Sequence, residues 1–164
     1  MLYLIAGAGL LAVDQWVKYW VTVHLELGAS APLLPGFLEL LRVHNYGAAW
    51  SSFSGMRWLL LGLTGAIVMA VIFAVAKKLV RHPLGLAAAT LIISGGLGNI
   101  LDRARLGYVV DMFNFQFMHY PVFNVADICI VSGAILGAAY YLWFYEKYDG
   151  KETANGNADA ESKS

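Results

Sequence analysis

The sequence predicts a mainly α-helical integral membrane protein with four transmembrane helices. Of its 164 residues, 59% are hydrophobic and only 13% are charged, and the mean hydropathy is +0.61. A typical soluble domain has roughly 25% charged residues. A membrane-spanning helix needs about 20 consecutive apolar residues. Two segments without any charge meet this requirement, Trp58 to Ala76 and Pro83 to Leu101.

Two further apolar segments complete the predicted set of four spans. The first runs from Leu2 to Val23 and is interrupted by Asp14, Gln15 and Lys18. No basic stretch precedes it and no small-residue cleavage site follows it, so we expect it to be retained as a helix. The last runs from about Ile128 to Tyr145, with Asp127 at its entrance.

The distribution of basic residues predicts the orientation of these spans. Lys77, Lys78 and Arg81 lie in the short turn between the second and third spans, and further lysines follow Tyr145. The positive-inside rule places both segments, and therefore both termini, on the cytoplasmic side. We expect one membrane domain over residues 1–148 and a disordered, polar, cytoplasmic tail over residues 149–164.

The segment of about residues 24–57 is then extracytoplasmic, as is the segment of about residues 102–124. Pro32, Pro35 and Gly36 disfavour a helix in the first of these. The stretch that follows, residues 37–43, is a candidate strand at the membrane surface.

Several classes of function find no support in the composition. The net charge is zero and the eleven basic residues are scattered, so we predict no nucleic-acid partner. Cys129 is the single cysteine, which excludes an intramolecular disulfide and a zinc site built from paired cysteines. The four histidines are isolated and none lies within a span, so neither a zinc protease nor a serine nucleophile such as Ser94 has the residues it needs. We therefore expect no metal and no cofactor.

Charged residues within the spans need an explanation, because each costs roughly 2.5–3.5 kcal/mol on insertion scales. Asp14 and Lys18 are four residues apart on one helix, and the acid precedes the base, so they can pair. The favoured interpretation is a structural ion pair that fixes the first helix against its neighbours. The alternative is that Asp14 supports a site close by.

The end of the third span combines small and polar residues. Gly95, Gly96 and Gly98 allow another helix or a bound chain to approach the backbone closely. Beyond them, Asn99, Asp102 and Arg103 occupy adjoining positions on one helix face. An arginine at this depth can be a simple interfacial anchor. Asn99 lies within apolar sequence and needs hydrogen-bond partners, which indicates that it points inward.

Two further carboxylates, Asp111 and Asp127, lie in apolar surroundings at the outer membrane face. Asn124 precedes Asp127 by three residues, so it can cap the fourth helix with Asp127 in the first turn. Either aspartate alone is best explained as a cap or a surface acid. Two carboxylates held side by side share one proton, however, and such a pair can activate water for peptide hydrolysis without a cofactor. The sequence alone leaves open whether Asp111 and Asp127 meet.

Taken together, the polar blocks resemble those of the bacterial lipoprotein signal peptidases (signal peptidase II), in the same order around four spans. The blocks are Asp14-Gln15-x-x-Lys18, Asn45-Tyr46-Gly47-Ala48-Ala49-Trp50, Gly98-Asn99-Ile100-Leu101-Asp102-Arg103, Val109-Val110-Asp111 and Phe123-Asn124-Val125-Ala126-Asp127. One departure is that the connection from Asp111 to Asp127 is compact for this family.

The resemblance implies an aspartic endopeptidase of the bacterial inner (cytoplasmic) membrane with its active site at the extracytoplasmic face. It implies that Asp111 and Asp127 are the catalytic pair. It further implies a small extracytoplasmic β-sheet and a flanking surface helix. The implied substrates are diacylglyceryl-modified prolipoproteins, cut before the lipid-bearing cysteine, with membrane lipid as surroundings and no obligate protein partner. The residues implied to bind substrate or support the site are Asp14, Lys18, Asn45, Gly98, Asn99, Asp102, Arg103, Asn124 and Ala126.

Three alternatives remain at this point. The strongest from another class is a small transport or channel component in which Asp14, Lys18, Asp111 and Asp127 relay protons or ions. A second is an intramembrane aspartyl protease whose substrates carry no lipid. A third is a membrane scaffold without chemistry, which leaves the polar blocks unexplained.

Overall fold

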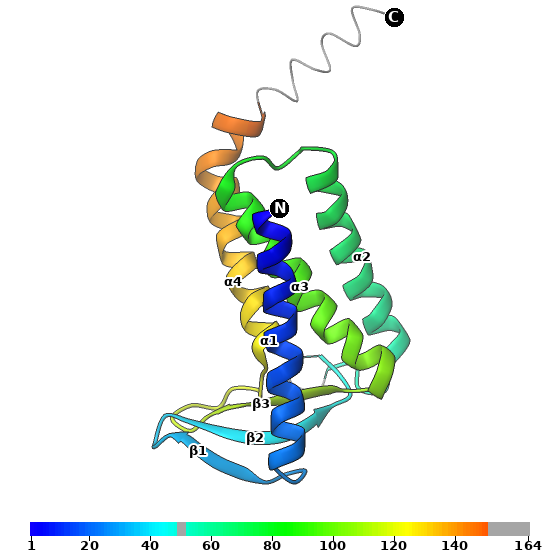
Figure 1. Cartoon of the computed structure of the whole chain (residues 1–164), viewed down its shortest axis with the longest axis vertical. Coiled ribbons are helices and arrows are strands. Elements are labelled where there is room, and N and C mark those ends of the chain that lie inside the picture. Colours follow the sequence, from blue (N-terminus) through cyan, green and yellow to red (C-terminus); the bar gives the residue numbers. More distant parts are fainter. Residues whose placement is uncertain (49–51, 151–164) are drawn as a thin grey trace, which may run out of the picture.

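The computed structural model describes residues 1–48 and 52–150, which form four α-helices, a three-stranded sheet and a final π-helical segment (Figure 1). In chain order the elements are α1 (Leu2–His24), β1 (Ser30–Leu34), β2 (Leu38–Asn45), α2 (Arg57–Ala76), α3 (Pro83–Leu106), β3 (Val109–Phe115), α4 (Val125–Tyr140) and η2 (Tyr141–Gly150). The sheet lies across one end of the helices, and the N-terminus, the α2–α3 turn and η2 lie toward the other end.

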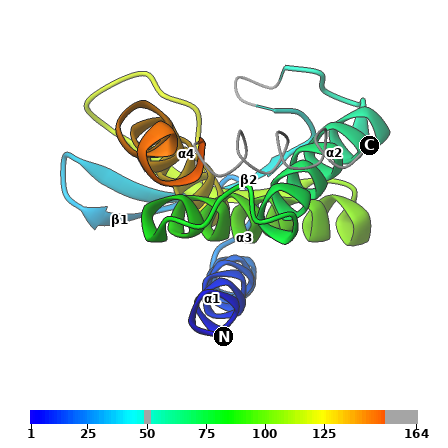
Figure 2. The same cartoon turned by 90° about the horizontal axis from the view of Figure 1, so that it is seen from above.

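Helix α3 is the central helix and packs against the other three. Seen from above, α1 lies on one side of α3, and α2 and α4 lie on the opposite side (Figure 2). Three glycines in the second half of α3 each face a different neighbour: Gly95 faces the Ala126 carbonyl of α4, Gly96 faces Val68 of α2, and Gly98 faces Asp14 of α1. The prediction that these small residues allow close approach is therefore confirmed.

Three helical segments within the described residues are long and apolar enough to cross a membrane, namely Arg57–Ala76, Pro83–Leu106 and Val125–Asp149. Helix α1 has the length but is not among these three segments, and Asp14, Gln15 and Lys18 interrupt its apolar sequence. The structure thus supports three of the four predicted spans by length and composition.

The sheet is antiparallel, with strand order β1-β2-β3. Strand β2 confirms the strand expected over residues 37–43. Val21 of α1 packs with Val110 and Met112 of β3 in a buried cluster, which attaches the sheet to the helices. The pairing of β2 with β3 places Val43 opposite Asp111, so the strand register sets the position of this carboxylate.

Three features of the structure differ from the sequence-based expectations. Helix α3 continues to Leu106 instead of ending at Leu101, because Gly107, with φ of 89°, is the residue that terminates it. No surface helix is found in residues 46–48 and 52–56, which form turns. Phe53 and Gly55 there have φ of 57° and 82°, a left-handed conformation that interrupts a helix.

The third difference is at the C-terminal end, where Asp149 and Gly150 belong to η2. The Asp149 carboxylate accepts hydrogen bonds from the backbone N–H groups of Arg81 (3.2 Å) and His82 (3.4 Å) and from the Tyr140 hydroxyl (2.5 Å). These bonds tie the end of η2 to the α2–α3 turn. The remainder of the expected polar tail, residues 151–164, lies outside the described residues.

Candidate active site

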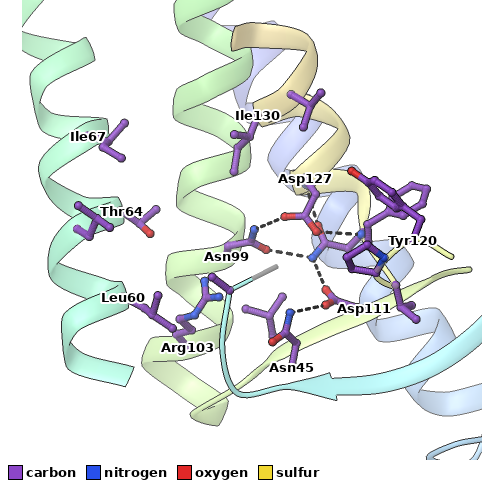
Figure 3. Close-up of a pocket in the computed structure, with 18 residues that line it drawn as sticks. Asn45, Leu60, Thr64, Ile67, Asn99, Arg103, Asp111, Tyr120, Asp127 and Ile130 are labelled. Carbon is purple, nitrogen blue, oxygen red and sulfur yellow. Dashed lines mark hydrogen bonds between the residues drawn. The ribbon is translucent and has the colours of Figure 1, made fainter. Parts of the chain in front are cut away.

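Asp111 and Asp127 line the same cavity, of about 310 Å³, at the sheet end of the helices (Figure 3). Asp111 comes from β3 and its side chain is 2% exposed, and Asp127 comes from the first turn of α4 and is partly buried. Strand and helix thus bring two carboxylates from separate parts of the chain to one place.

Asn124 connects the two carboxylates. Its side-chain oxygen accepts a hydrogen bond from the backbone N–H of Asp127 (2.9 Å), and its own backbone N–H donates to Asp127 Oδ2 (3.1 Å), which completes a capping box. The predicted cap is therefore confirmed. In addition, Asn124 Nδ2 donates to Asp111 Oδ1 at 2.6 Å.

Two more asparagines donate to the carboxylates. Asn45, at the end of β2, donates from Nδ2 to Asp111 Oδ2 (2.9 Å). Asn99 of α3 donates from Nδ2 to Asp127 Oδ1 (2.8 Å). Each oxygen of both carboxylates therefore accepts a hydrogen bond from the protein, which holds the side chains in fixed orientations.

The surroundings of Asp111 favour its protonated form. Burial raises the pKa of Asp111 and the charge of Asp127 raises it further, to about 7, against the opposing effects of Asn45, Asn124 and Lys18. A carboxyl group with this pKa keeps a proton up to neutral pH, so the pair can carry one shared proton there.

Apolar residues form most of the remaining cavity wall. Those of α2 and α4 are Leu60, Leu63, Ile67, Ile130 and Val131. Others come from β3 and from the segment before α4, namely Val109, Pro121, Val122 and Phe123. Arg103 also lines the cavity and donates from Nη2 to the carbonyl of Gly47 (2.7 Å). Its Nε atom is buried and has no hydrogen-bond partner within residues 1–48 and 52–150.

A second polar cluster lies between α1 and α3. Lys18 Nζ is 2.9 Å from Asp14 Oδ2 and 3.1 Å from Asp102 Oδ2, which confirms the predicted pairing of Lys18 with Asp14. Gln15 Nε2 donates to both acids, at 3.1 Å and 3.0 Å. None of these residues lines the cavity, so they act on the site through other groups.

The structure divides the sequence-predicted site residues into two sets. The cavity is lined by Asn45, Asn99, Arg103, Asp111, Asn124 and Asp127. The supporting set around it comprises Asp14, Lys18, Gly98, Asp102 and Ala126. Asn99, Asp102 and Arg103 were expected on one helix face, but Asp102 turns toward Lys18 while the other two line the cavity.

Gln15 was not predicted as a site residue, although a polar side chain beside Asp14 in an apolar helix was an available signal. The apolar wall residues carry no such signal, since they resemble any lipid-facing residue in sequence. In the described part of the chain, no group of three or more His, Cys, Asp or Glu side chains is arranged to hold a metal ion.

Comparisons with known proteins agree on one family. A sequence model of the family described as Signal peptidase (SPase) II matches residues 6–143. A relative from Lactococcus lactis subsp. cremoris (strain SK11), named lipoprotein signal peptidase, is 43% identical over 75% of this chain and 81% of its own. Relatives with the same name from Lactiplantibacillus plantarum and Enterococcus faecalis are 40% and 36% identical, over 82% and 95% of this chain and 89% and 96% of their own.

Two solved structures of bacterial membrane enzymes, obtained by the in meso method at 2.3 and 1.9 Å resolution, are also similar. The first has a TM-score of 0.81 and 27% identity and covers 89% of each chain. The second has a TM-score of 0.79 and 28% identity, over 87% of this chain and 93% of the other. The chain is therefore a membrane peptidase that belongs to the signal peptidase II family.

Proposed function

We propose that Asp111 and Asp127 are the catalytic pair of this lipoprotein signal peptidase, which hydrolyses the peptide bond before the diacylglyceryl-modified cysteine of prolipoproteins. The observation that carries the assignment is that both carboxylates line one cavity and are joined through Asn124. The relatives named lipoprotein signal peptidase support the substrate class.

The pair works as an acid and a base on either side of the scissile bond. The ionised carboxylate takes a proton from a water molecule as the water attacks the peptide carbonyl. The protonated carboxyl donates a hydrogen bond to the carbonyl oxygen, which lowers the cost of the negative charge that develops there. The proton is then passed to the leaving amine, and release of the two products restores the pair.

The cavity suits a substrate that is apolar on one side of the cut. Leu60 and Ile67 of α2 and Ile130 of α4 line the cavity and can receive the apolar signal peptide (Figure 3), and Leu63 of α2 lines it as well. The buried Nε atom of Arg103 is available to donate to a substrate carbonyl. The diacylglyceryl group anchors the substrate in the outer leaflet and so holds the scissile bond at the depth of the pair.

The topology is part of the same proposal. We propose that α1 is a fourth span, that both termini are cytoplasmic, and that the sheet and the catalytic pair face the extracytoplasmic side of the bacterial inner membrane. Lys77, Lys78 and Arg81 lie at the opposite end from the sheet, which agrees with the positive-inside rule. Residues 1–150, which include η2, form the proposed peptidase domain, and residues 151–164 form its proposed cytoplasmic tail.

The test is cleavage of a synthetic diacylglyceryl-modified signal peptide by the purified protein in lipid. Asp111→Asn and Asp127→Asn should each lower kcat by at least about 1,000-fold, since removal of a catalytic group commonly costs that much or more. Both variants should still purify as folded membrane proteins. Glu26→Gln, which changes an exposed carboxylate at the same end of the molecule, is the matched control and should retain the wild-type rate.

Retained turnover in either aspartate variant contradicts the catalytic assignment. The unlipidated peptide distinguishes the reaction from that of a general intramembrane aspartyl protease, which would cut both peptides equally. The alternative of an ion relay predicts proton or ion flux across vesicles and no cleavage, and nothing among the relatives supports it.

A further inference from the structure

Lys18 is buried on the α1 side of α3, and its ammonium group reaches the hydrogen-bond network of the catalytic pair. Lys18 is 3% exposed, and the other buried residues of α1 are Asp14 and Val21. The Nζ atom contacts Asp14 Oδ2 at 2.9 Å, Asp102 Oδ2 at 3.1 Å and Asn99 Oδ1 at 3.1 Å. An ammonium group has three N–H donors, so each donor has one acceptor.

This contact fixes the direction of the Asn99 carboxamide. An ammonium group can only donate, so the Asn99 atom that faces Lys18 must be the oxygen. The NH₂ end must then point the other way, where it meets Asp127 Oδ1 at 2.8 Å. Asn124 Nδ2 also donates to Asn99 Oδ1, but it is a neutral donor at 3.2 Å. Charge-assisted hydrogen bonds are roughly twice as strong, so Lys18 contributes the larger share.

The two acids bound to Lys18 hold the backbone beside the catalytic residues. Asp14 Oδ1 accepts from the N–H of Ala126 (2.9 Å), one residue before Asp127. Asp102 Oδ2 accepts from the N–H of Val110 (3.2 Å), one residue before Asp111. Lys18 therefore connects, through its two partners, the helix and the strand that carry the pair.

We propose that Lys18 is a positioning residue of the peptidase, which keeps Asn99 donating to Asp127 and holds the two aspartate-bearing segments in place. This inference rests on the proposed function of Asp111 and Asp127. Lys18 does not line the cavity, so it reaches the substrate only through Asn99, Asp14 and Asp102.

The charge of Lys18 gives the proposal a readout that simple packing would not share. Lys18 and Asp14 of α1 and Arg103 of α3 interact electrostatically with the pair, and Asp102 of α3 interacts with Arg103 and is paired with Lys18. Burial and Asp127 raise the pKa of Asp111, and the Lys18 charge lowers it. Removal of that charge should therefore raise the pKa of Asp111 further and move the pH–activity profile toward alkaline pH.

The experiment compares Lys18→Met with wild type in the lipidated-peptide assay, over pH values on both sides of the activity maximum. Methionine has nearly the length of lysine but no charge and no N–H. We expect kcat to fall about 10- to 100-fold, as for other residues that orient reacting groups, with KM little changed. We expect the profile to move by about one pH unit toward alkaline pH. Lys147→Met, at an exposed position of η2, is the matched control.

The double variant Lys18→Met/Asp14→Asn separates the effect of the Lys18 charge from its effect on the direction of the Asn99 carboxamide. It leaves the cluster with one excess negative charge, as in the wild type, but without the ammonium donor to Asn99. We expect its pH profile to return toward that of the wild type while kcat stays low. The double variant also contains one buried charge fewer than Lys18→Met, so it serves if the single variant does not fold.

Two results would overturn the proposal: wild-type kcat in either Lys18 variant, or a folded Lys18→Met protein with reduced kcat at an unshifted pH profile. These outcomes are distinct from failure of the proposed function. The Lys18 variants are judged against a wild type that cleaves, whereas the catalytic assignment fails through Asp111→Asn or Asp127→Asn.

Discussion

The direction of each asparagine side chain at the site follows from a partner that can only donate. The backbone N–H of Gly47 donates to Oδ1 of Asn45. The backbone N–H of Asp127 donates to Oδ1 of Asn124. The Lys18 ammonium faces the same atom of Asn99. All three NH₂ groups must therefore point at the carboxylates of Asp111 and Asp127. The network is built to receive two acceptors, which favours carboxylates at these positions over amides.

At the same scale, the pH dependence follows from the protonation of Asp111. Its pKa is raised to about 7, so the group holds its proton below that pH and loses it above. A pair that needs one proton should lose activity as the pH rises through this value. We expect kcat/KM to fall on the alkaline side toward a slope of about tenfold per pH unit. Initial rates on the lipidated peptide at saturating lipid would measure this limb, and rates that keep increasing well above neutral pH would contradict it.

At the scale of elements, the sequence predicts the positions of the helices better than the residues at which they end. The apolar stretch of α3 stops at Leu101 because that length matches the bilayer. The helix itself continues, since Asp102 pairs with Lys18 and Arg103 donates to the carbonyl of Gly47, so these charges have partners within the protein. The length of an apolar stretch reflects the thickness of the membrane, whereas the helix itself ends where Gly107 adopts a left-handed conformation.

The pairing of β3, the strand that carries Asp111, could not be predicted from the sequence. The pairing of β3 with β2 joins residues far apart in the sequence, such as Val43 and Asp111, and no local pattern encodes that register. Asp111 and Asp127 could be singled out as carboxylates in apolar sequence, and the family resemblance implied their catalytic role. Their convergence at one cavity could not be predicted, because it depends on a strand register and on a helix start that are set independently.

Close packing at α3 leads to a prediction about one glycine. A Cβ atom on Gly98 would lie 2.5 Å from Asp14 Oδ2 and 3.3 Å from the Ala126 Cβ, so Gly98→Ala must displace Asp14 or the start of α4. Overpacking typically costs about 1–3 kcal/mol. We expect a lower thermal unfolding temperature in lipid and a reduced kcat, because Asp14 holds Ala126 beside Asp127.

The matched control is Gly137→Ala, where the new Cβ would meet the Ala88 Cβ at an ordinary 3.8 Å. It places the same methyl group between α4 and α3, but ten residues after Asp127 on α4. Wild-type stability and activity in Gly98→Ala, or an equal loss in both variants, would show that the contact with Asp14 is not the cause.

For the whole molecule, the arrangement separates a basic end from a catalytic end. The basic turn between α2 and α3 lies at one end, where Asp149 of η2 is bonded to Arg81 and His82. The sheet and the cavity with Asp111 and Asp127 lie at the other. Under the proposed function, substrates anchored by a lipid meet the end that carries the cavity.

The proposed four-span topology can be tested with single cysteines and a membrane-impermeant thiol reagent in intact cells. Glu26, Lys77 and Leu2 are exposed in the structure, at the sheet end, in the α2–α3 turn and at the start of α1. The native Cys129 is buried and should react little. We expect Glu26→Cys to be labelled from outside, and Lys77→Cys and Leu2→Cys to be labelled only after the cells are permeabilised. The result for Leu2→Cys is decisive for α1. Labelling from outside would place both ends of α1 on one side of the membrane, whereas protection requires the helix to cross, carrying Asp14 and Lys18 into the bilayer as partners of the catalytic network.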